Sequence, residues 1–195
     1  NFCHYEIPKG SGKMALFTSA LWLGGVDVNG QLKLAALRYR DGQDYWTGPL
    51  TTAGDATIPA EVCEQFDAHF RITKDEVKLF NEWFISGQDD QLNGTTTQNS
   101  NFPEYQIPEA IINWPAHGDI ALGQDYYLAP FYDRNLDGNY DPINDGDYPW
   151  YDLNKEVDCK TSRTVTLFGD ETLWWVMNDK GNIHTETEAE PLGLE

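Results

Sequence analysis

Basic residues are scarce in this sequence. Its 195 residues include 13 Lys and Arg against 32 Asp and Glu, which leaves a formal net charge of −19. A surface with this charge repels nucleic-acid phosphates and anionic lipid headgroups, so the composition argues against nucleic acid as a partner and against binding to anionic membranes. The same surface attracts cations.

Long apolar runs are missing as well. No stretch approaches the roughly 18 apolar residues that a membrane-spanning helix needs, so no segment is expected to insert directly into a membrane. Hydrophobic residues nevertheless make up 40% of the chain and aromatic residues 13%. This share of apolar and ring surface predicts a folded, β-rich globular protein and argues against disorder.

Cysteine occurs only three times, as Cys3, Cys63 and Cys159, without the spacing of a zinc site. The wide separation permits one long-range disulfide with one thiol left over. We favour a Cys63–Cys159 bond, because Cys3 lies at an end of the sequence and can pair with residues upstream of it. The alternative is three unpaired thiols that pack as small hydrophobic side chains.

Two β features are predicted in the first half of the chain. Residues 14–23 are apolar and aromatic, and Asn29-Gly30 is a strong hairpin signal because both residues tolerate a positive φ. Residues 14–40 are therefore predicted to form a β-hairpin. In residues 66–72, apolar side chains alternate with polar ones, which is typical of a half-buried strand.

One helix has a clear start. Thr73 and Glu76 have the spacing of a capping box, in which each side chain binds the backbone N–H of the other residue. An apolar stripe follows at helical spacing, and Gly87 is predicted to end the helix, which gives a helix over residues 74–85. The polar residues 86–106 are predicted to form a long, mobile surface loop.

Further short elements are expected in the second half of the chain. Pro108 is predicted to open a short helical turn, and strands are predicted over residues 126–131, 164–168 and 172–177. No internal repeat and no clear domain boundary are visible. The patterns together predict a mainly β protein: a single domain over residues 1–195, with an antiparallel β-sandwich-like fold, one clear helix and long loops.

Residues 133–141 carry the most specific chemical signal. Oxygen-bearing side chains stand at positions 1, 3, 5 and 9 of this loop, and Gly138 stands at position 6. This spacing wraps a short chain around a hard cation of calcium size. Asp133, Asn135 and Asp137 would supply side-chain oxygens, and the glycine would permit the sharp turn.

The remaining ligands would come from the second half of the loop. Asn139 would offer its backbone carbonyl, and Asp141 would bind the ion directly or through water. Asp145 or Asp147 would complete the shell, in the manner of thrombospondin-like or dockerin-like loops. Asn144 stands where an EF-hand has its bidentate glutamate, which argues against an EF-hand. The expected role of the calcium ion is structural; the alternative is a solvated acidic turn without an ion.

Common catalytic motifs are absent from the sequence. It contains neither G-x-S-x-G nor H-E-x-x-H. Gly10-Ser11-Gly12-Lys13 looks like part of a phosphate-binding loop, but Ile7 stands where the first glycine belongs and Met14 replaces the Ser or Thr that holds magnesium. The four histidines are far apart and are predicted to be surface or strand residues. We predict no enzyme activity and assign no catalytic residue.

Aromatic residues form three groups, at residues 126–127, 148–151 and 174–175. Such groups can build a platform on which sugar rings stack. More often they form the core and rim of a β-sheet, and this second interpretation is favoured from the sequence.

Several stretches together resemble one family: residues 5–10, 20–27, 133–148, 173–187 and 191–195. They resemble the N-terminal region of large secreted proteins of Bacteroidota that carry a C-terminal type IX secretion sorting domain. The resemblance implies export across the outer membrane, a location at the outer cell surface or outside the cell, and a longer exported chain of which these residues are a fragment. It implies no catalytic residues.

The expected function is therefore a non-enzymatic, calcium-stabilised extracellular or cell-surface module of a type IX-secreted protein, with an adhesin, filament or scaffold role. Its partners would be other surface or secreted proteins, or glycans. Two alternatives remain: a glycan- or protein-binding domain that uses exposed aromatic residues, and part of a secreted hydrolase.

Overall fold

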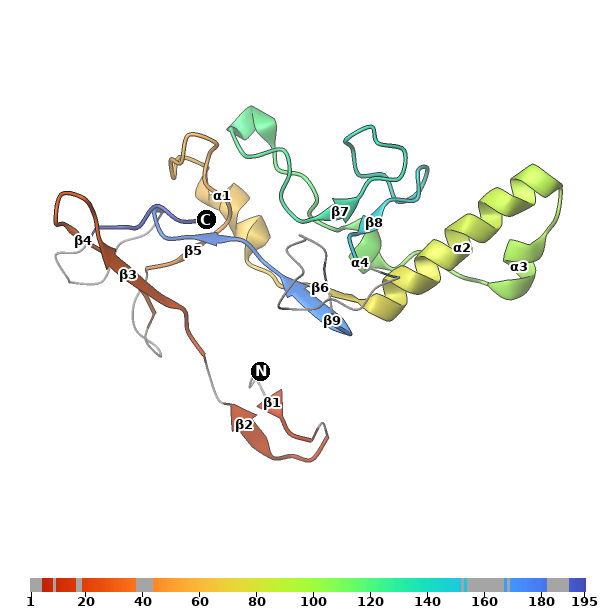
Figure 1. Ribbon diagram of the computed structural model, residues 1–195, viewed down its shortest axis with the longest axis horizontal. Helices are drawn as coiled ribbons and strands as arrows, with labels where there is room; N and C mark the ends of the chain where they lie inside the picture. Colours follow the sequence, from red (N-terminus) through yellow and green to blue (C-terminus); the bar gives the residue numbers. More distant parts are fainter. Residues whose placement is uncertain are drawn as a thin grey trace. The chain divides into compact units, whose positions relative to one another are not determined.

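The computed structural model describes residues 5–8, 10–16, 19–37, 44–151, 153, 167, 169–181 and 190–195. The chain divides into two compact units (Figure 1). Unit 1 consists of Asn1–Asp67 and Val176–Glu195, and unit 2 consists of Ala68–Trp175. Unit 2 is therefore inserted, in the order of the sequence, between the two parts of unit 1.

Unit 1 is built mainly from short antiparallel strand pairs. The pairs are β1 (Tyr5–Glu6) with β2 (Met14–Leu16), β3 (Trp22–Val26) with β4 (Leu32–Ala36), and β5 (Trp46–Thr47) with β10 (Met177–Asn178). The helix α1 (Ala60–Cys63) and the 3-10 turn η1 (Glu64–Phe66) follow β5. The predicted hairpin is confirmed for β3 and β4, with Gly30 at a φ of +82° in the turn. Residues 14–16 instead pair with β1.

The end of the chain packs on strands near its start. The backbone N–H of Leu34 in β4 donates to the Glu190 carbonyl at 3.0 Å, and the Lys33 ammonium contacts the Glu190 carboxylate at 2.5 Å. The Glu195 carboxylate accepts from the Leu50 N–H at 2.7 Å. Unit 1 thus needs residues from both ends of the sequence.

Unit 2 combines helices with two short antiparallel sheets. The strand pairs are β6 (Phe70–Thr73) with β9 (Glu171–Trp174), and β7 (Phe131–Tyr132) with β8 (Tyr148–Pro149). The helical elements are α2 (Lys74–Asn93), α3 (Thr97–Asn101), α4 (Glu109–Ile112) and the 3-10 turn η2 (Ile120–Leu122). In Figure 1, α2 is the long helix that leads to α3, and β6 lies beside β9.

The capping box predicted for α2 is confirmed. The Thr73 hydroxyl accepts from the Glu76 N–H at 3.2 Å, and the Glu76 carboxylate accepts from the Thr73 N–H at 2.9 Å. This arrangement satisfies N–H groups that the first turn of a helix leaves without intrahelical partners. The helix follows β6 directly. Of the strand predicted over residues 66–72, only residues 70–72 are in β6, and Phe66 ends the 3-10 turn η1.

The predicted end of this helix is wrong. Helix α2 continues through Gly87 to Asn93 and ends at Gly94, which has the left-handed φ of +67°. The segment predicted as a loop over 86–106 therefore contains the last turns of α2 and all of α3. Gly87 has a packing role, because a Cβ atom at this position would lie 2.4 Å from the side-chain amide of Gln98 in α3.

The predicted fold class is confirmed only in part. The strands are antiparallel, but they form small sheets alongside several helices, and the described residues contain no closed β-sandwich. The short helix after Pro108 is present as α4, whereas only Phe131 of the predicted strand 126–131 is in a strand. Apart from Leu167, the predicted strand 164–168 lies outside the described residues. Within the described part of the chain, no helix is both long and apolar enough to cross a membrane.

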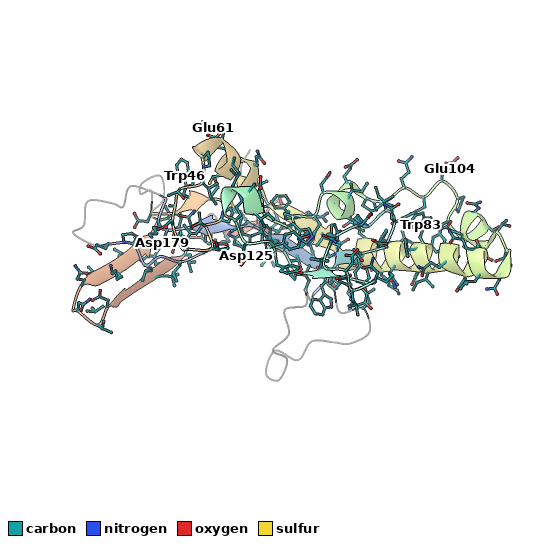
Figure 2. The ribbon with its side chains drawn as sticks, turned by 90° about the horizontal axis from the view of Figure 1, so that it is seen from above. Trp46, Glu61, Trp83, Glu104, Asp125 and Asp179 are labelled. Carbon is teal, nitrogen blue, oxygen red and sulfur yellow. The ribbon has the colours of Figure 1, made fainter. Side chains whose placement is uncertain are left out.

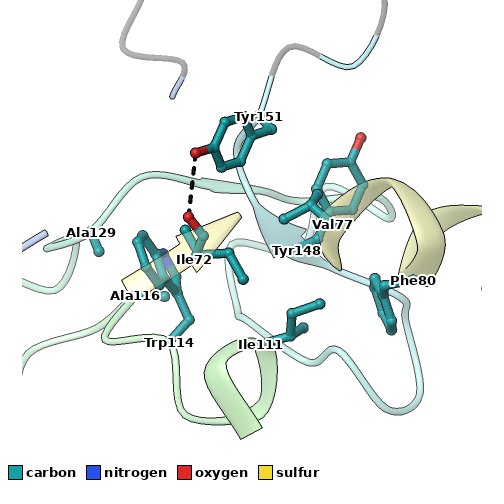
Figure 3. Packing of buried hydrophobic residues seen from close by; sticks show 9 residues of the cluster. All are labelled: Ile72, Val77, Phe80, Ile111, Trp114, Ala116, Ala129, Tyr148 and Tyr151. Carbon is teal, nitrogen blue, oxygen red and sulfur yellow. Dashed lines mark hydrogen bonds between the residues drawn. The ribbon is translucent and has the colours of Figure 1, made fainter. Parts of the chain in front are cut away.

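A buried apolar cluster holds unit 2 together (Figure 3). Its members are Ile72, Val77, Phe80, Ile111, Trp114, Ala116, Ala129, Tyr148 and Tyr151. The Tyr151 hydroxyl donates to the Ile72 carbonyl at 3.4 Å and lies 2.7 Å from the Thr172 hydroxyl. The cluster thereby ties the β6–β9 pair to the segment that follows β8.

Candidate functional site

The acidic loop, residues 133–147, connects β7 to β8. Asp133 organises its first turn: one carboxylate oxygen accepts from the Leu136 N–H at 2.7 Å, and the other accepts from the Gly138 N–H at 2.7 Å. Leu136 and Gly138 both have a positive φ, of 63° and 83°. The chain therefore turns tightly around the Asp133 carboxylate.

The next predicted ligands belong to the same turn. The Asn135 side-chain amide donates to the Asp137 carboxylate at 3.1 Å, and the Asn139 N–H donates to the same carboxylate at 2.7 Å. Both hydrogen bonds lower the pKa of Asp137, and the one from the Asn139 N–H has the larger effect. The Asn139 side-chain oxygen accepts from the Tyr126 hydroxyl at 2.6 Å. The structure thus brings Asp133, Asn135, Asp137 and Asn139 together.

Asp141 organises a second turn. Its carboxylate accepts from the Ile143 N–H at 3.1 Å, from the Asn144 N–H at 2.9 Å and from the Asn144 side-chain amide at 2.7 Å. These bonds lower the pKa of Asp141, and the bond from the Asn144 side-chain amide has the largest effect. The Asp141 carbonyl also accepts from the N–H groups of Asp145 and Gly146, both at 3.1 Å. Asp141 is therefore held as a carboxylate inside a closed turn.

Asp147 joins the two turns. Its carboxylate is completely buried and accepts from the Arg134 N–H and from the Asp141 N–H, each at 2.9 Å. Burial raises the pKa of Asp147, and the charges of Asp133 and Asp145 add to the increase, while the two N–H donors oppose it. Negative charge is therefore concentrated where the loop closes.

Arg134 fastens the acidic loop to α2. Its guanidinium donates to the Asn81 side-chain oxygen at 2.6 Å and to the Gly146 carbonyl at 3.3 Å. The same group lies over the Phe84 ring, 5.1 Å from its centroid, which is a cation–π arrangement. The only basic residue of the loop thus serves its attachment to the helix.

His117 connects the acidic loop to Tyr126, an aromatic residue that precedes the loop in the sequence. Its Nδ1 lies 3.0 Å from the Tyr126 carbonyl, and its Nε2 accepts from the Tyr140 N–H at 2.9 Å. Since a carbonyl only accepts and a backbone N–H only donates, the ring is neutral with its proton on Nδ1. The ring also stacks on Tyr126 at a centroid distance of 4.1 Å. The sequence offers no signal for this role, because nothing in it pairs residue 117 with residue 140.

The donor set of the loop suits calcium, which prefers carboxylate, amide and carbonyl oxygens. Each ionised carboxylate has about four lone-pair directions, so one that accepts from two or three N–H groups can still bind an ion. Among the described residues, however, no group of three or more His, Cys, Asp or Glu side chains is placed to hold a metal. The loop oxygens turn toward backbone donors instead, and the calcium site remains a prediction.

The cysteines give a partial result. Cys63 is buried in unit 1 and forms no disulfide among the described residues. Burial raises the pKa of its thiol, and a hydrogen bond with Trp46 partly opposes this increase. Cys3 and Cys159 lie outside the described residues. The Cys63–Cys159 disulfide therefore remains a prediction.

A groove of about 620 Å³ lies beside the start of the acidic loop. Its lining includes Tyr127, Phe131, Trp150, Trp174 and the loop residue Asp133. Each of the three aromatic groups noted in the sequence contributes one of these residues. Unit 2 thus brings together aromatic side chains that are far apart in the chain.

A second hollow, of about 590 Å³, lies between α2 and α3. Trp83, which is labelled on α2 in Figure 2, lines it together with polar side chains that include Gln91 and Asn99. The carboxylate of Asp90 accepts from the N–H groups of Thr97 and Gln98 at 2.8 and 2.7 Å and so fixes α3 against α2. Ile143 and Asn144 of the acidic loop also line this hollow.

The chain matches no protein-family model, and no curated protein or solved structure gives a significant match. The chemistry of the acidic loop and of the aromatic groove is therefore the basis on which a function is assigned. The export expected from the resemblance in the sequence remains an expectation.

Proposed function

We propose that the chain is a non-enzymatic extracellular or cell-surface module of a protein exported by type IX secretion, and that one calcium ion stabilises its acidic loop. Its role would be that of an adhesin, filament or scaffold component whose partners are other surface or secreted proteins. The resemblance in the sequence supports the export, and the loop supports the ion.

The observation that carries the calcium proposal is the environment of Asp147. This carboxylate is completely buried, and burial raises its pKa; the N–H groups of Arg134 and Asp141 oppose the increase, while the charges of Asp133 and Asp145 add to it. Three negative groups in one closed turn repel each other, and a divalent cation beside them would remove that repulsion.

The geometry also favours one distribution of ligands. Asp147 is completely buried where it joins the two turns, whereas Asp145 is only half-buried, so we assign the closing ligand to Asp145. Asp133, Asn135 and Asp137 would contribute side-chain oxygens and Asn139 its carbonyl, at about 2.3–2.6 Å from the ion. Asp141, which several donors already hold, would bind through water.

A site of this kind needs only a modest affinity. Extracellular calcium sites work with dissociation constants of about 0.1–1 mM, because calcium is plentiful outside cells. An ion that binds only the folded chain stabilises it by about 2.7 kcal/mol at a hundredfold excess over the dissociation constant. Calcium would thus act as a fold stabiliser that is lost in a calcium-poor compartment.

The proposed function also implies an oxidising environment, in which the Cys63–Cys159 disulfide can form. Alkylation of unfolded, unreduced protein would then modify one of the three cysteines, and reduction would expose the other two. Modification of all three thiols without reduction would contradict the disulfide and leave the calcium proposal unaffected.

Hydrogen exchange in millimolar calcium and in EDTA tests the calcium proposal directly. Calcium should slow the exchange of residues 131–150 and raise the melting temperature, whereas magnesium at the same concentration should have a smaller effect. The β3–β4 hairpin provides an internal reference that should not respond. Identical exchange and identical melting in calcium and EDTA would show that the loop is an acidic turn without an ion.

A further inference from the structure

We propose that the aromatic groove of unit 2 binds a neutral glycan. Tyr127, Phe131, Trp150 and Trp174 would cover the apolar faces of its sugar rings, and Asp133 would accept hydrogen bonds from hydroxyl groups. This assignment adds a binding activity to the structural role proposed for the acidic loop.

Two of the lining residues expose much of their ring surface. Tyr127 is 59% exposed and Trp150 is 36% exposed. Aromatic surface in water is a source of binding free energy when a ligand covers it, and a pyranose ring offers a flat face of C–H groups for this purpose. The volume of about 620 Å³ is in the range of small-molecule binding sites.

The backbone at Trp150 and the ring of Tyr127 are held by contacts within unit 2 before any ligand binds. The Trp150 N–H donates to the Pro130 carbonyl at 3.1 Å, and the Trp150 carbonyl accepts from the Leu167 N–H at 2.7 Å. Tyr127 stacks on Phe131 with an interplanar angle of 26°. A binding surface that is already ordered loses little conformational entropy when it engages a ligand.

Trp174 is equally fixed, because β9 pairs with β6 and the Trp174 ring lies 5.8 Å from the Phe70 ring. The groove is therefore built on paired backbone and packed rings. Sites on such rigid elements position a ligand more precisely than sites on unsupported loops.

The charge of Asp133 and the net charge of the chain favour a neutral, hydroxyl-rich ligand over an apolar peptide or an acidic glycan. The Asp133 carboxylate lines the groove and only accepts hydrogen bonds, so it suits a ligand that is rich in hydroxyl donors. An apolar peptide would bury this carboxylate against side chains that cannot bind it. An acidic glycan would meet the repulsion of a chain with a net charge of −19.

Affinity electrophoresis of the full chain tests the assignment. The gels contain soluble neutral polysaccharides (β-glucan, xylan, galactomannan or starch) or an anionic one (alginate), with either calcium or EDTA. At least one neutral polysaccharide should retard the protein. Trp150→Ala and Tyr127→Ala should each weaken this binding by about tenfold or more, since single aromatic anchors carry much of the affinity of a site.

Trp175→Ala is the matched control. Trp175 neighbours Trp174 in the sequence and is 49% exposed, but it does not line the groove. Its removal should leave the retardation unchanged. Circular dichroism verifies that each variant is folded, and Tyr127→Ala replaces Trp150→Ala if the latter unfolds.

Three outcomes would overturn the assignment: no retardation by any neutral polysaccharide, retardation by the anionic one alone, or equal losses in Trp175→Ala and the groove variants. A protein that binds the groove in place of a glycan would appear as the first of these outcomes. The calcium proposal is judged separately, because Trp150→Ala should keep the wild-type response of the melting temperature to calcium.

Discussion

The ring of Phe84 on α2 lies directly against the backbone of Gly146 in the acidic loop. A Cβ atom at residue 146 would lie 2.3 Å from the ring, which is closer than any real contact of this kind. Gly146 also has a φ of +76°, which side-chain-bearing residues rarely adopt. The loop can close on the helix only because this residue has no side chain.

Gly146→Ala should therefore destabilise the protein by about 2–5 kcal/mol, as the sum of a left-handed backbone and an overpacked contact. Gly54→Ala separates the two effects, because Gly54 has the same φ of +76° with no atom within 4 Å of the added Cβ. It should cost only about 1–2 kcal/mol. Urea unfolding measures both changes, and equal losses would mean that the Phe84 contact relaxes without cost.

Asp137→Ala should remove most of the calcium response, because it deletes a ligand from the middle of the acidic loop. In wild-type protein, saturating calcium should raise the melting temperature by roughly 5–10 °C for a stabilisation of the size expected above. Asp89→Ala is the control, since it removes a carboxylate from the exposed surface of α2. Thermal unfolding in calcium and in EDTA gives the result, and an unchanged calcium response in Asp137→Ala would contradict the ligand assignment.

Acid should loosen α3 before it unfolds the rest of unit 2. Hydrogen bonds lower the pKa of Asp90 from 3.8 to about 2. The bond from the Thr95 hydroxyl has the largest effect, and those from the N–H groups of Gln98 and Thr97 add to it. A carboxyl whose pKa is lower in the folded state stabilises the fold above its ordinary pKa, and this contribution is lost as the pH falls toward 2. The protection of the α3 amides, which is the exchange rate of an unfolded peptide divided by theirs at the same pH, should therefore fall between pH 4 and 2.

Asp90→Asn provides the test of this acid effect. It should lower the protection of the α3 amides already at pH 5, and it should remove the further loss of protection toward pH 2. Asp89→Asn changes a neighbouring carboxyl whose side chain does not bind α3, and it should keep the wild-type profile. An acid-dependent profile that persists in Asp90→Asn would assign the effect to another group.

His117→Phe should destabilise the folded chain by about 1–3 kcal/mol. The substitution keeps an aromatic ring, but it leaves the Tyr140 N–H without its acceptor. The Tyr126 carbonyl loses its bond with His117 and keeps only the one from the Gly118 N–H at 3.2 Å. His69→Phe is the comparison, because His69 is exposed and contacts only the Trp175 ring among the described aromatic residues. It should change the unfolding free energy by no more than about 0.5 kcal/mol. Similar losses in both variants would show that the hydrogen bonds of His117 are not what stabilises this region.

Local sequence patterns predicted local structure well. The Thr73–Glu76 capping box and the hairpin turn at Asn29-Gly30 depend on residues a few positions apart. The capping box is present as predicted, and the hairpin forms with a positive φ at Gly30 but not at Asn29. Gly87 shows where such reasoning fails. A glycine after an apolar stripe is a common helix end, but this one is a contact point for α3, and the left-handed cap is Gly94.

The long-range features of the site had no signal in the sequence. The spacing of residues 133–141 identified the turn, but it could not show that Asp147 closes it through Arg134 and Asp141. The same applies to the groove: the sequence shows three aromatic groups, and only tertiary packing selects one ring from each. Sheet content was overestimated because aromatic and β-branched residues also fill the core around α2 and α4.

The division of unit 1 between the two ends of the sequence has a consequence for synthesis. Synthesis runs from the N-terminus, so all of unit 2 is made before Met177 and Asn178, the strand that pairs with β5. The N-terminal part of unit 1 therefore leaves the ribosome without this partner strand, in a chain whose domains tend to fold as they emerge. The edge of β5 stays unpaired until the residues that follow unit 2 have emerged as well.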